Sequence, residues 1–150
     1  MRKRNRERAY PPLVRTVQRR VRFEEVDQIS YMWHGHYASW LEDGREDLGA
    51  YFHISYLDFY HCGVSVPLKT LLFDFKIPLR YNNIYTIETS LLWNEAAVLE
   101  YTYRILDAEQ HCMTMASTTQ LMLDAEGKLL LDSPHFYKKF CEQWAQGLVR

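Results

Sequence analysis

Long hydrophobic runs, cysteine pairs and glycine-rich motifs are missing from this 150-residue chain. No stretch of 18 apolar residues occurs, so no membrane-spanning helix is expected. The three cysteines lie far apart and form no CxxC or Cys/His cluster, which excludes a typical zinc site and favours a reducing compartment. The basic N-terminus precedes no apolar stretch and so does not predict a secretory signal. We expect a cytoplasmic protein without metal or cofactor.

Catalytic signatures of several large enzyme classes are also missing. The six glycines never fall at the spacing of a phosphate-binding loop or of a dinucleotide-binding turn. No serine hydrolase motif is present either. These absences exclude the common nucleotide-dependent and serine-dependent chemistries.

Charge is distributed unevenly along the chain. Residues 1–22 hold nine Arg or Lys against one Glu, whereas residues 23–150 hold nine against eighteen Asp or Glu. Residues 1–12 lack apolar periodicity and end in Pro-Pro, which indicates a flexible basic arm. An apolar content of 47% predicts that residues 13–150 form one globular domain.

Hydrophobic periodicity predicts one long helix among strands. From Gly35 to Phe52, apolar side chains follow helical spacing, and Gly44 within this stripe predicts close packing. Period-two patterns predict strands over Leu13–Phe23, Val64–Tyr81, Ile84–Asn94, Ala97–Leu106 and Cys112–Leu123. We expect a hairpin turn at Asn82-Asn83, an irregular connection over His53–Gly63 and a last helix over His135–Ala145. The apolar face of this helix must be buried against another element. The sequence therefore predicts an α+β domain whose meandering antiparallel sheet wraps around the helix.

The run from Phe23 to Glu46, FEEVDQISYMWHGHYASWLEDGRE, resembles the signature of hotdog-fold thioesterases of the 4-hydroxybenzoyl-CoA thioesterase family. The matching positions are Asp27, His34 and Tyr37, followed by Glu42 and Arg45, which match a recurrent Glu…Arg pair. The later run Pro78–Asn83 resembles the Pro-containing strand of that family. Departures from the family pattern occur at Ile29, Ser30, His36 and Asn83. The resemblance implies a five-stranded antiparallel sheet around one helix and the hydrolysis of acyl thioesters.

The chemistry implied by this resemblance centres on the junction before the helix. Asp27, expected to be buried there, would act as nucleophile or general base, while amides at the helix start polarise the carbonyl. His34 would orient a water, hydrogen-bond Asp27 or line the pocket. Substrate contacts are expected from Tyr31, Met32, Trp33, Gly35, His36 and Tyr37, and further aromatic pocket candidates are Trp40, Phe59 and Tyr60. Glu42 and Asp43 are alternative catalytic carboxylates, although a Glu42–Arg45 ion pair is the simpler interpretation.

Substrate and partners stay open at this level. The thiol would belong to coenzyme A or to an acyl carrier protein, and Lys69, Lys76, Arg80, Arg104 and Lys128 are too scattered to decide. The resemblance implies a homodimer or a tetramer. A hotdog dehydratase or hydratase and a non-catalytic acyl-CoA-binding module are the alternatives. Nucleic-acid binding through the arm is disfavoured because positive charge stops at Arg22 and the remaining chain is acidic.

Overall fold

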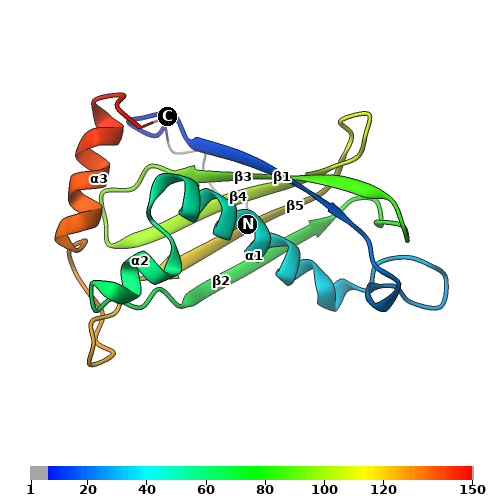
Figure 1. The fold of residues 1–150 in the computed structure, drawn as a ribbon, viewed down its shortest axis with the longest axis horizontal. Coiled ribbons are helices and arrows are strands. Elements are labelled where there is room, and N and C mark those ends of the chain that lie inside the picture. Colours follow the sequence, from blue (N-terminus) through cyan, green and yellow to red (C-terminus); the bar gives the residue numbers. More distant parts are fainter. Residues whose placement is uncertain (1–6, 150) are drawn as a thin grey trace.

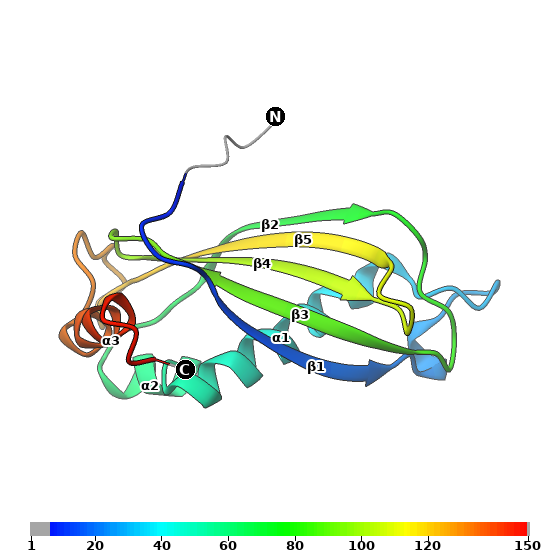
Figure 2. The same cartoon turned by 90° about the horizontal axis from the view of Figure 1, so that it is seen from above.

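A computed structural model describes residues 7–149, in which one long helix crosses one face of a curved sheet (Figures 1 and 2). The helices are α1 (Tyr37–Phe52), α2 (Tyr56–His61) and α3 (His135–Ala145), with short 3-10 turns at Phe23–Glu25 and His34–His36. The strands are β1 (Leu13–Arg20), β2 (Leu68–Phe75), β3 (Ile84–Leu92), β4 (Val98–Leu106) and β5 (Cys112–Leu121). The α+β prediction with five strands is confirmed.

The strand order is β1-β3-β4-β5-β2, and every neighbouring pair is antiparallel. The predicted meander is confirmed for β3, β4 and β5, but the predicted hairpin at Asn82-Asn83 is wrong, because β2 lies at the sheet edge beside β5 and not beside β3. Asn82 does have the positive φ of a turn, 65°. The turn extends the β1–β3 ladder instead. The Val21 amide donates to the Asn83 carbonyl, and the Asn82 amide donates to the Val21 carbonyl, both at 3.0 Å.

Two element predictions differ from the structure for local reasons. The strand predicted over Val64–Tyr81 is limited to β2, since prolines at 67 and 78 cannot donate to a ladder. The connection predicted as irregular contains α2, which starts with a capping box. In that box the Asp58 amide donates to the Ser55 hydroxyl at 3.2 Å, and the Ser55 amide donates to the Asp58 carboxylate at 2.8 Å. The last helix has the predicted bounds.

The acidic face of α1 is divided between two tasks. Asp47 accepts a bidentate pair from Arg15, and Asp43 accepts from Arg19 at 2.8 Å, so successive turns of α1 are tied to β1. Glu42 and Glu46 point to the other side, toward the β2 edge of the sheet. The helix is thus held over the sheet by ion pairs at one flank and is open at the other.

Gly44 lies where α1 approaches the sheet most closely. A Cβ there would meet the Thr89 hydroxyl, and Ile87 Cγ2 would lie at 3.2 Å. We expect Gly44→Ala to lower the free energy of unfolding by about 1–3 kcal/mol through overpacking. Thr89→Ala in the same chain should recover part of that loss, because the Thr89 hydroxyl is buried without a partner among the described residues. Urea unfolding of both single variants and the double variant measures the coupling; additive effects would contradict the contact.

Both ends of the described chain pack on one end of the sheet. The Trp144 indole of α3 donates to the Pro11 carbonyl at 3.1 Å, Tyr10 packs edge-on against Trp93, and Arg8 pairs with Glu100 at 2.7 Å. The arm predicted over residues 1–12 stays untested for residues 1–6, which lie outside the described range. Within residues 7–149, no helix is long and apolar enough to cross a membrane.

Candidate active site

The candidate catalytic residue Asp27 opens a tight loop that returns at Met32. Its Oδ1 accepts hydrogen bonds from the amides of Ile29, at 2.9 Å, and Tyr31, at 3.2 Å. No described residue donates to its second oxygen. The expectation of a buried carboxylate is wrong for the single chain, because Asp27 is exposed. One oxygen therefore holds the loop, while the other has no partner among the described residues.

Glu25 fixes this loop to the rest of the fold. The residue is only 2% exposed, yet its carboxylate is fully partnered. Arg19 and the Trp40 indole donate to Oε2 at 2.8 and 2.9 Å, and the Arg22 amide donates to Oε1 at 3.0 Å. The Glu25 carbonyl also accepts from the Trp33 amide at 2.9 Å. A single buried acid thus links β1, α1 and both ends of the Asp27 loop.

The far side of the loop pairs with the segment that follows Pro78. The Met32 amide donates to the Leu79 carbonyl at 2.8 Å, and the Tyr81 amide donates to the Ser30 carbonyl at 3.0 Å. Met32 is buried in the core, whereas Tyr31 is half-buried under the Arg80 guanidinium, 5.3 Å above its ring. Met32 is therefore a core residue in this chain, and Tyr31 stays available to a ligand.

Two backbone amides are free where the helix begins. Among the described residues, no group accepts from the amides of His34 and Gly35, while those of His36 and Tyr37 close the 3-10 turn. Free amides at a helix start carry partial positive charge and stabilise a developing oxyanion. The Trp33 side chain lies over Gly35, so that any Cβ there would collide with the indole. Only glycine fits beneath the indole at this point.

The two histidines and Tyr37 have different surroundings. The rings of His34 and His36 flank the exposed Trp33 indole, with centroids 4.9 and 5.6 Å away. No hydrogen bond joins His34 to Asp27 within residues 7–149. Tyr37 is buried, its hydroxyl accepts from the Leu79 amide at 3.4 Å, and burial raises its pKa above the ordinary value. Tyr37 therefore anchors the helix start to the loop partner segment.

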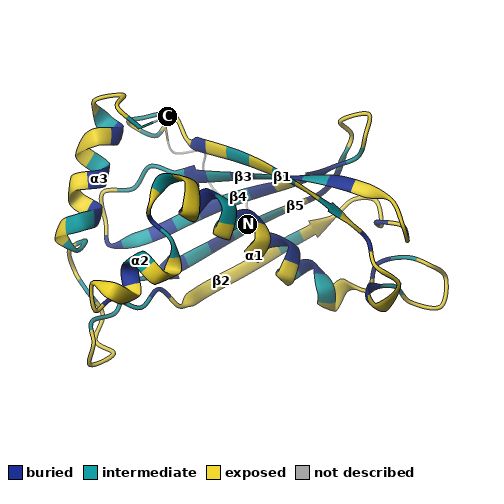
Figure 3. Cartoon of the chain, viewed as in Figure 1, coloured by how far each residue is buried: buried dark blue, intermediate teal, exposed yellow. Residues whose placement is uncertain are grey.

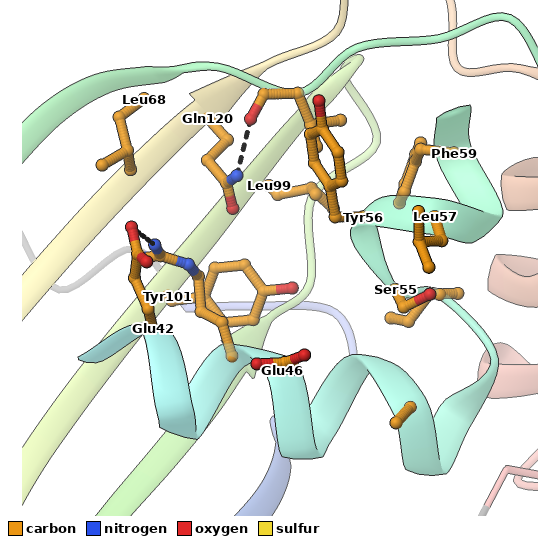
Figure 4. A pocket seen from close by; sticks show the side chains of 14 residues that line it. Glu42, Glu46, Ser55, Tyr56, Leu57, Phe59, Leu68, Leu99, Tyr101 and Gln120 are labelled. Carbon is orange, nitrogen blue, oxygen red and sulfur yellow. Dashed lines mark hydrogen bonds and ion pairs between the residues drawn. The ribbon is translucent and has the colours of Figure 1, made fainter. Parts of the chain in front are cut away.

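A cavity of about 680 Å³ lies toward the other end of α1, between α1, α2 and the sheet (Figure 4). Of the aromatic pocket candidates, Phe59 lines this cavity, but Trp33, Tyr37, Trp40 and Tyr60 do not. Glu42 stands at its rim, 3.5 Å from Arg45, so the predicted ion pair is present. Asp43 is engaged by Arg19 instead. Figure 1 shows α2, which borders the cavity, at one end of α1 and the loop that leads into α1 at the other end, so the cavity and the Asp27 loop are separated within one chain.

The five scattered cations do not form a cluster. Lys76, Arg104 and Lys128 each pair with a nearby acid, at 2.9, 2.8 and 3.4 Å respectively. Arg80, bonded to Tyr31 at 3.4 Å, is the one that contacts the Asp27 loop. Within the described range, no group of three or more His, Cys, Asp or Glu residues is arranged to hold a metal ion.

The family model described as the thioesterase-like superfamily matches residues 21–141, which include the loop, α1 and all strands after β1. The chain belongs to this superfamily. Its sheet and helix form the hotdog fold that the sequence resemblance implied, and this thioesterase is accordingly a thioester hydrolase.

Solved structures of other proteins share this arrangement of sheet and helix over most of the chain. A Staphylococcus aureus DHNA-CoA thioesterase superposes with a TM-score of 0.77 at 22% identity, over 91% of this chain and 97% of that one. A 1,4-dihydroxy-2-naphthoyl-CoA thioesterase from Synechocystis gives 0.75 at 18% identity, over 85% and 94%. Among relatives by sequence, the Bacillus subtilis (strain 168) protein named "Putative acyl-CoA thioesterase YneP" is 26% identical over 71% of this chain and 77% of its own length.

The sequence did not predict the roles of three residues that the structure places in a buried network or at the cavity. Glu25 was read only as part of an acidic run, and Tyr101 and Gln120 only as members of strands. Glu25 carried a weak signal, since an acid directly before a partly buried valine and the catalytic candidate indicates a buried partner. Tyr101 and Gln120 carried none, because only the packing of α2 shows that they face a cavity and not a filled core.

Proposed function

We propose that the thioesterase hydrolyses acyl-CoA thioesters, with Asp27 as the catalytic carboxylate. The observation that carries this proposal is the divided environment of Asp27. One oxygen is held by two backbone amides and the other is unpartnered within residues 7–149, at the junction that leads into the free amides of His34 and Gly35. The acyl-CoA class is supported by the name of the Bacillus subtilis relative.

In the proposed reaction, the thioester carbonyl oxygen accepts from the free amides at the helix start as negative charge develops on it. The free oxygen of Asp27 either takes a proton from an attacking water or attacks the carbonyl carbon itself. The bond from carbon to sulfur then breaks, and the thiolate leaves and takes up a proton. In the nucleophilic route this leaves the acyl group on Asp27 as an anhydride, which a water then hydrolyses to release the acid and restore the carboxylate. The net change is one water consumed, with a carboxylic acid and free coenzyme A released.

A second copy of the chain would complete the site. The edge strand β2 exposes Leu68, Leu71, Leu72 and Phe75, and most of the strand is drawn as exposed in Figure 3. An unpaired apolar edge is a template for pairing with another strand. Leu68 at the start of β2 borders the cavity, whereas Phe75 at its end touches the ring of Tyr37, 4.7 Å away at the helix start. Antiparallel pairing of two β2 strands would therefore bring the cavity of one copy beside the Asp27 loop of the other.

The dimer is tested by placing a charge on this edge. We expect Leu72→Lys to shift the thioesterase from dimer to monomer in light scattering coupled to size exclusion, and to lower thiol release at least about tenfold. Val14→Lys, at an exposed position on the opposite edge strand β1, is the matched control and should change neither. A Leu72→Lys protein that remains a fully active dimer would rule out pairing through β2.

The reaction itself is tested by thiol release from a panel of acyl-CoA thioesters, followed with a colorimetric thiol reagent. Release above the spontaneous rate supports the proposal. If acyl-CoA is bound without thiol release, the chain is a binding module and the proposal fails. Release only from acylated carrier protein would keep the hydrolase and replace coenzyme A as the carrier.

A further inference from the structure

The cavity between α1, α2 and the sheet has an apolar wall with polar groups set into it. Much of the wall comes from Ile54 between α1 and α2, Phe59 of α2, Val66 just before β2, and Leu99 of β4. A lining of this kind holds an apolar group and orients it through a few polar contacts. Three polar side chains on this lining decide what it can accept.

Two of these side chains are buried with unused hydrogen-bonding atoms. Tyr101 is 3% exposed, and no described residue bonds its hydroxyl, which Figure 4 shows at the cavity. Burial raises its pKa, so this hydroxyl stays a donor. The Gln120 amide nitrogen donates to the Val66 carbonyl at 2.6 Å, which leaves its own carbonyl oxygen without a donor from residues 7–149. Neither atom is among the fully buried polar atoms that lack a partner in residues 7–149, so both are accessible at the cavity and a ligand can bond to them.

The third side chain is Arg45, held against the cavity by a buried chain of hydroxyls. Its guanidinium donates to the Tyr103 hydroxyl at 3.2 Å, and that hydroxyl shares a hydrogen bond of 2.8 Å with Thr118. Only 13% of the Arg45 side chain is exposed. A guanidinium offers five N–H donors, so several remain for a ligand oxygen.

The charges around the cavity determine which oxygen-containing group of a ligand can bind there. Glu42 and Glu46 share the lining with Arg45, which leaves a net negative rim that disfavours a ligand carboxylate. A plain alkyl chain would leave Tyr101 and Gln120 unmatched. A hydroxyl fits best, since it accepts from Tyr101 or Arg45 and donates to the Gln120 carbonyl.

We propose that this cavity binds the far end of the acyl group and selects acyl thioesters that carry a hydroxyl there. The proposal rests on the proposed function, because the cavity receives an acyl group only if thioesters are the substrates. Tyr101, Arg45 and Gln120 are then the residues that set substrate specificity, and none of them takes part in the bond-breaking step.

The test compares acyl-CoA pairs that differ only in the distal hydroxyl, such as octanoyl-CoA and 8-hydroxyoctanoyl-CoA. We expect kcat/KM to favour the hydroxylated member at least about tenfold, because a site built to bond a hydroxyl rejects the analogue without it. Tyr101→Phe should remove most of this preference. Tyr137→Phe, a buried tyrosine of α3 that does not line the cavity, is the matched control and should preserve it. If Tyr101→Phe does not fold, Gln120→Leu provides the second variant.

Binding of non-hydrolysable thioethers separates this inference from the reaction. We would titrate S-octyl-CoA and S-(8-hydroxyoctyl)-CoA by calorimetry on the intact protein. Tighter binding of the hydroxylated thioether supports the inference even if no thioester is cleaved, in which case only the proposed function fails. Hydrolysis of both octanoyl thioesters with equal kcat/KM, and equal binding of both thioethers, would overturn the inference and leave the function standing.

Discussion

Asp27→Asn lowers kcat for acyl-CoA hydrolysis about 100-fold or more if Asp27 is the catalytic carboxylate. An amide can neither accept a proton from water nor attack a thioester, and positioned acid–base groups contribute about 10²–10⁴ in rate. The substitution preserves the local fold, because the Asn side-chain oxygen can still accept from the Ile29 and Tyr31 amides. The measurement is thiol release at saturating substrate, together with urea unfolding of both proteins.

The chain provides its own control for this substitution. Asp124 makes the same turn as Asp27, since its Oδ1 accepts from the amides two and four residues later, Glu126 and Lys128, both at 2.9 Å. Any structural cost of replacing such an aspartate should therefore also appear in Asp124→Asn. We expect Asp124→Asn to match wild type in kcat. Equal activity of the two variants would make Asp27 an ordinary turn residue and direct attention to Glu42, whose carboxylate is exposed at the cavity rim.

Glu25→Ala should lower the free energy of unfolding by about 3–5 kcal/mol, which is the cost of removing one partner from a buried ion pair. The change leaves the Trp40 indole and the Arg22 amide without an acceptor, and Arg19 retains only Asp43. Because the same carboxylate ties the Asp27 loop to α1, thiol release should also fall. Urea unfolding and the thiol assay report the two effects separately.

Glu24→Ala is the matched control for this loss. Glu24 is the neighbouring acid in the same 3-10 turn, but its side chain is 72% exposed and lies 3.5 Å from Arg22. Its removal should change the free energy of unfolding by no more than about 0.5 kcal/mol, as for most surface positions. A Glu25→Ala protein as stable as Glu24→Ala would show that the buried network contributes nothing to stability.

Local patterns in the sequence predicted those elements that local physics determines. The apolar stripe of α1 and the alternation in β3 and β4 follow from side-chain periodicity, which each segment carries by itself. The start of α3 was predicted from Ser133-Pro134 directly before it. The close packing at Gly44 was predicted because a missing Cβ in an apolar stripe has few other causes. The resemblance over Phe23–Glu46 added the hotdog fold and the thioesterase family, which the family match confirms.

Contacts between distant segments were decided only by the tertiary structure. The place of β2 beside β5 depends on which strand already occupies the flank of β3, and no residue of β2 encodes this. The exposure of Asp27 and the burial of Glu25 under Arg19 and Trp40 arise beside the start of α1, and the cavity lined by Tyr101 and Gln120 arises where α1, α2 and the sheet meet. Periodicity reports which face of a segment is apolar, but not what that face meets. The sequence by itself therefore determined the elements and the family, while packing between elements determined which carboxylates are buried or exposed and which polar groups line the cavity.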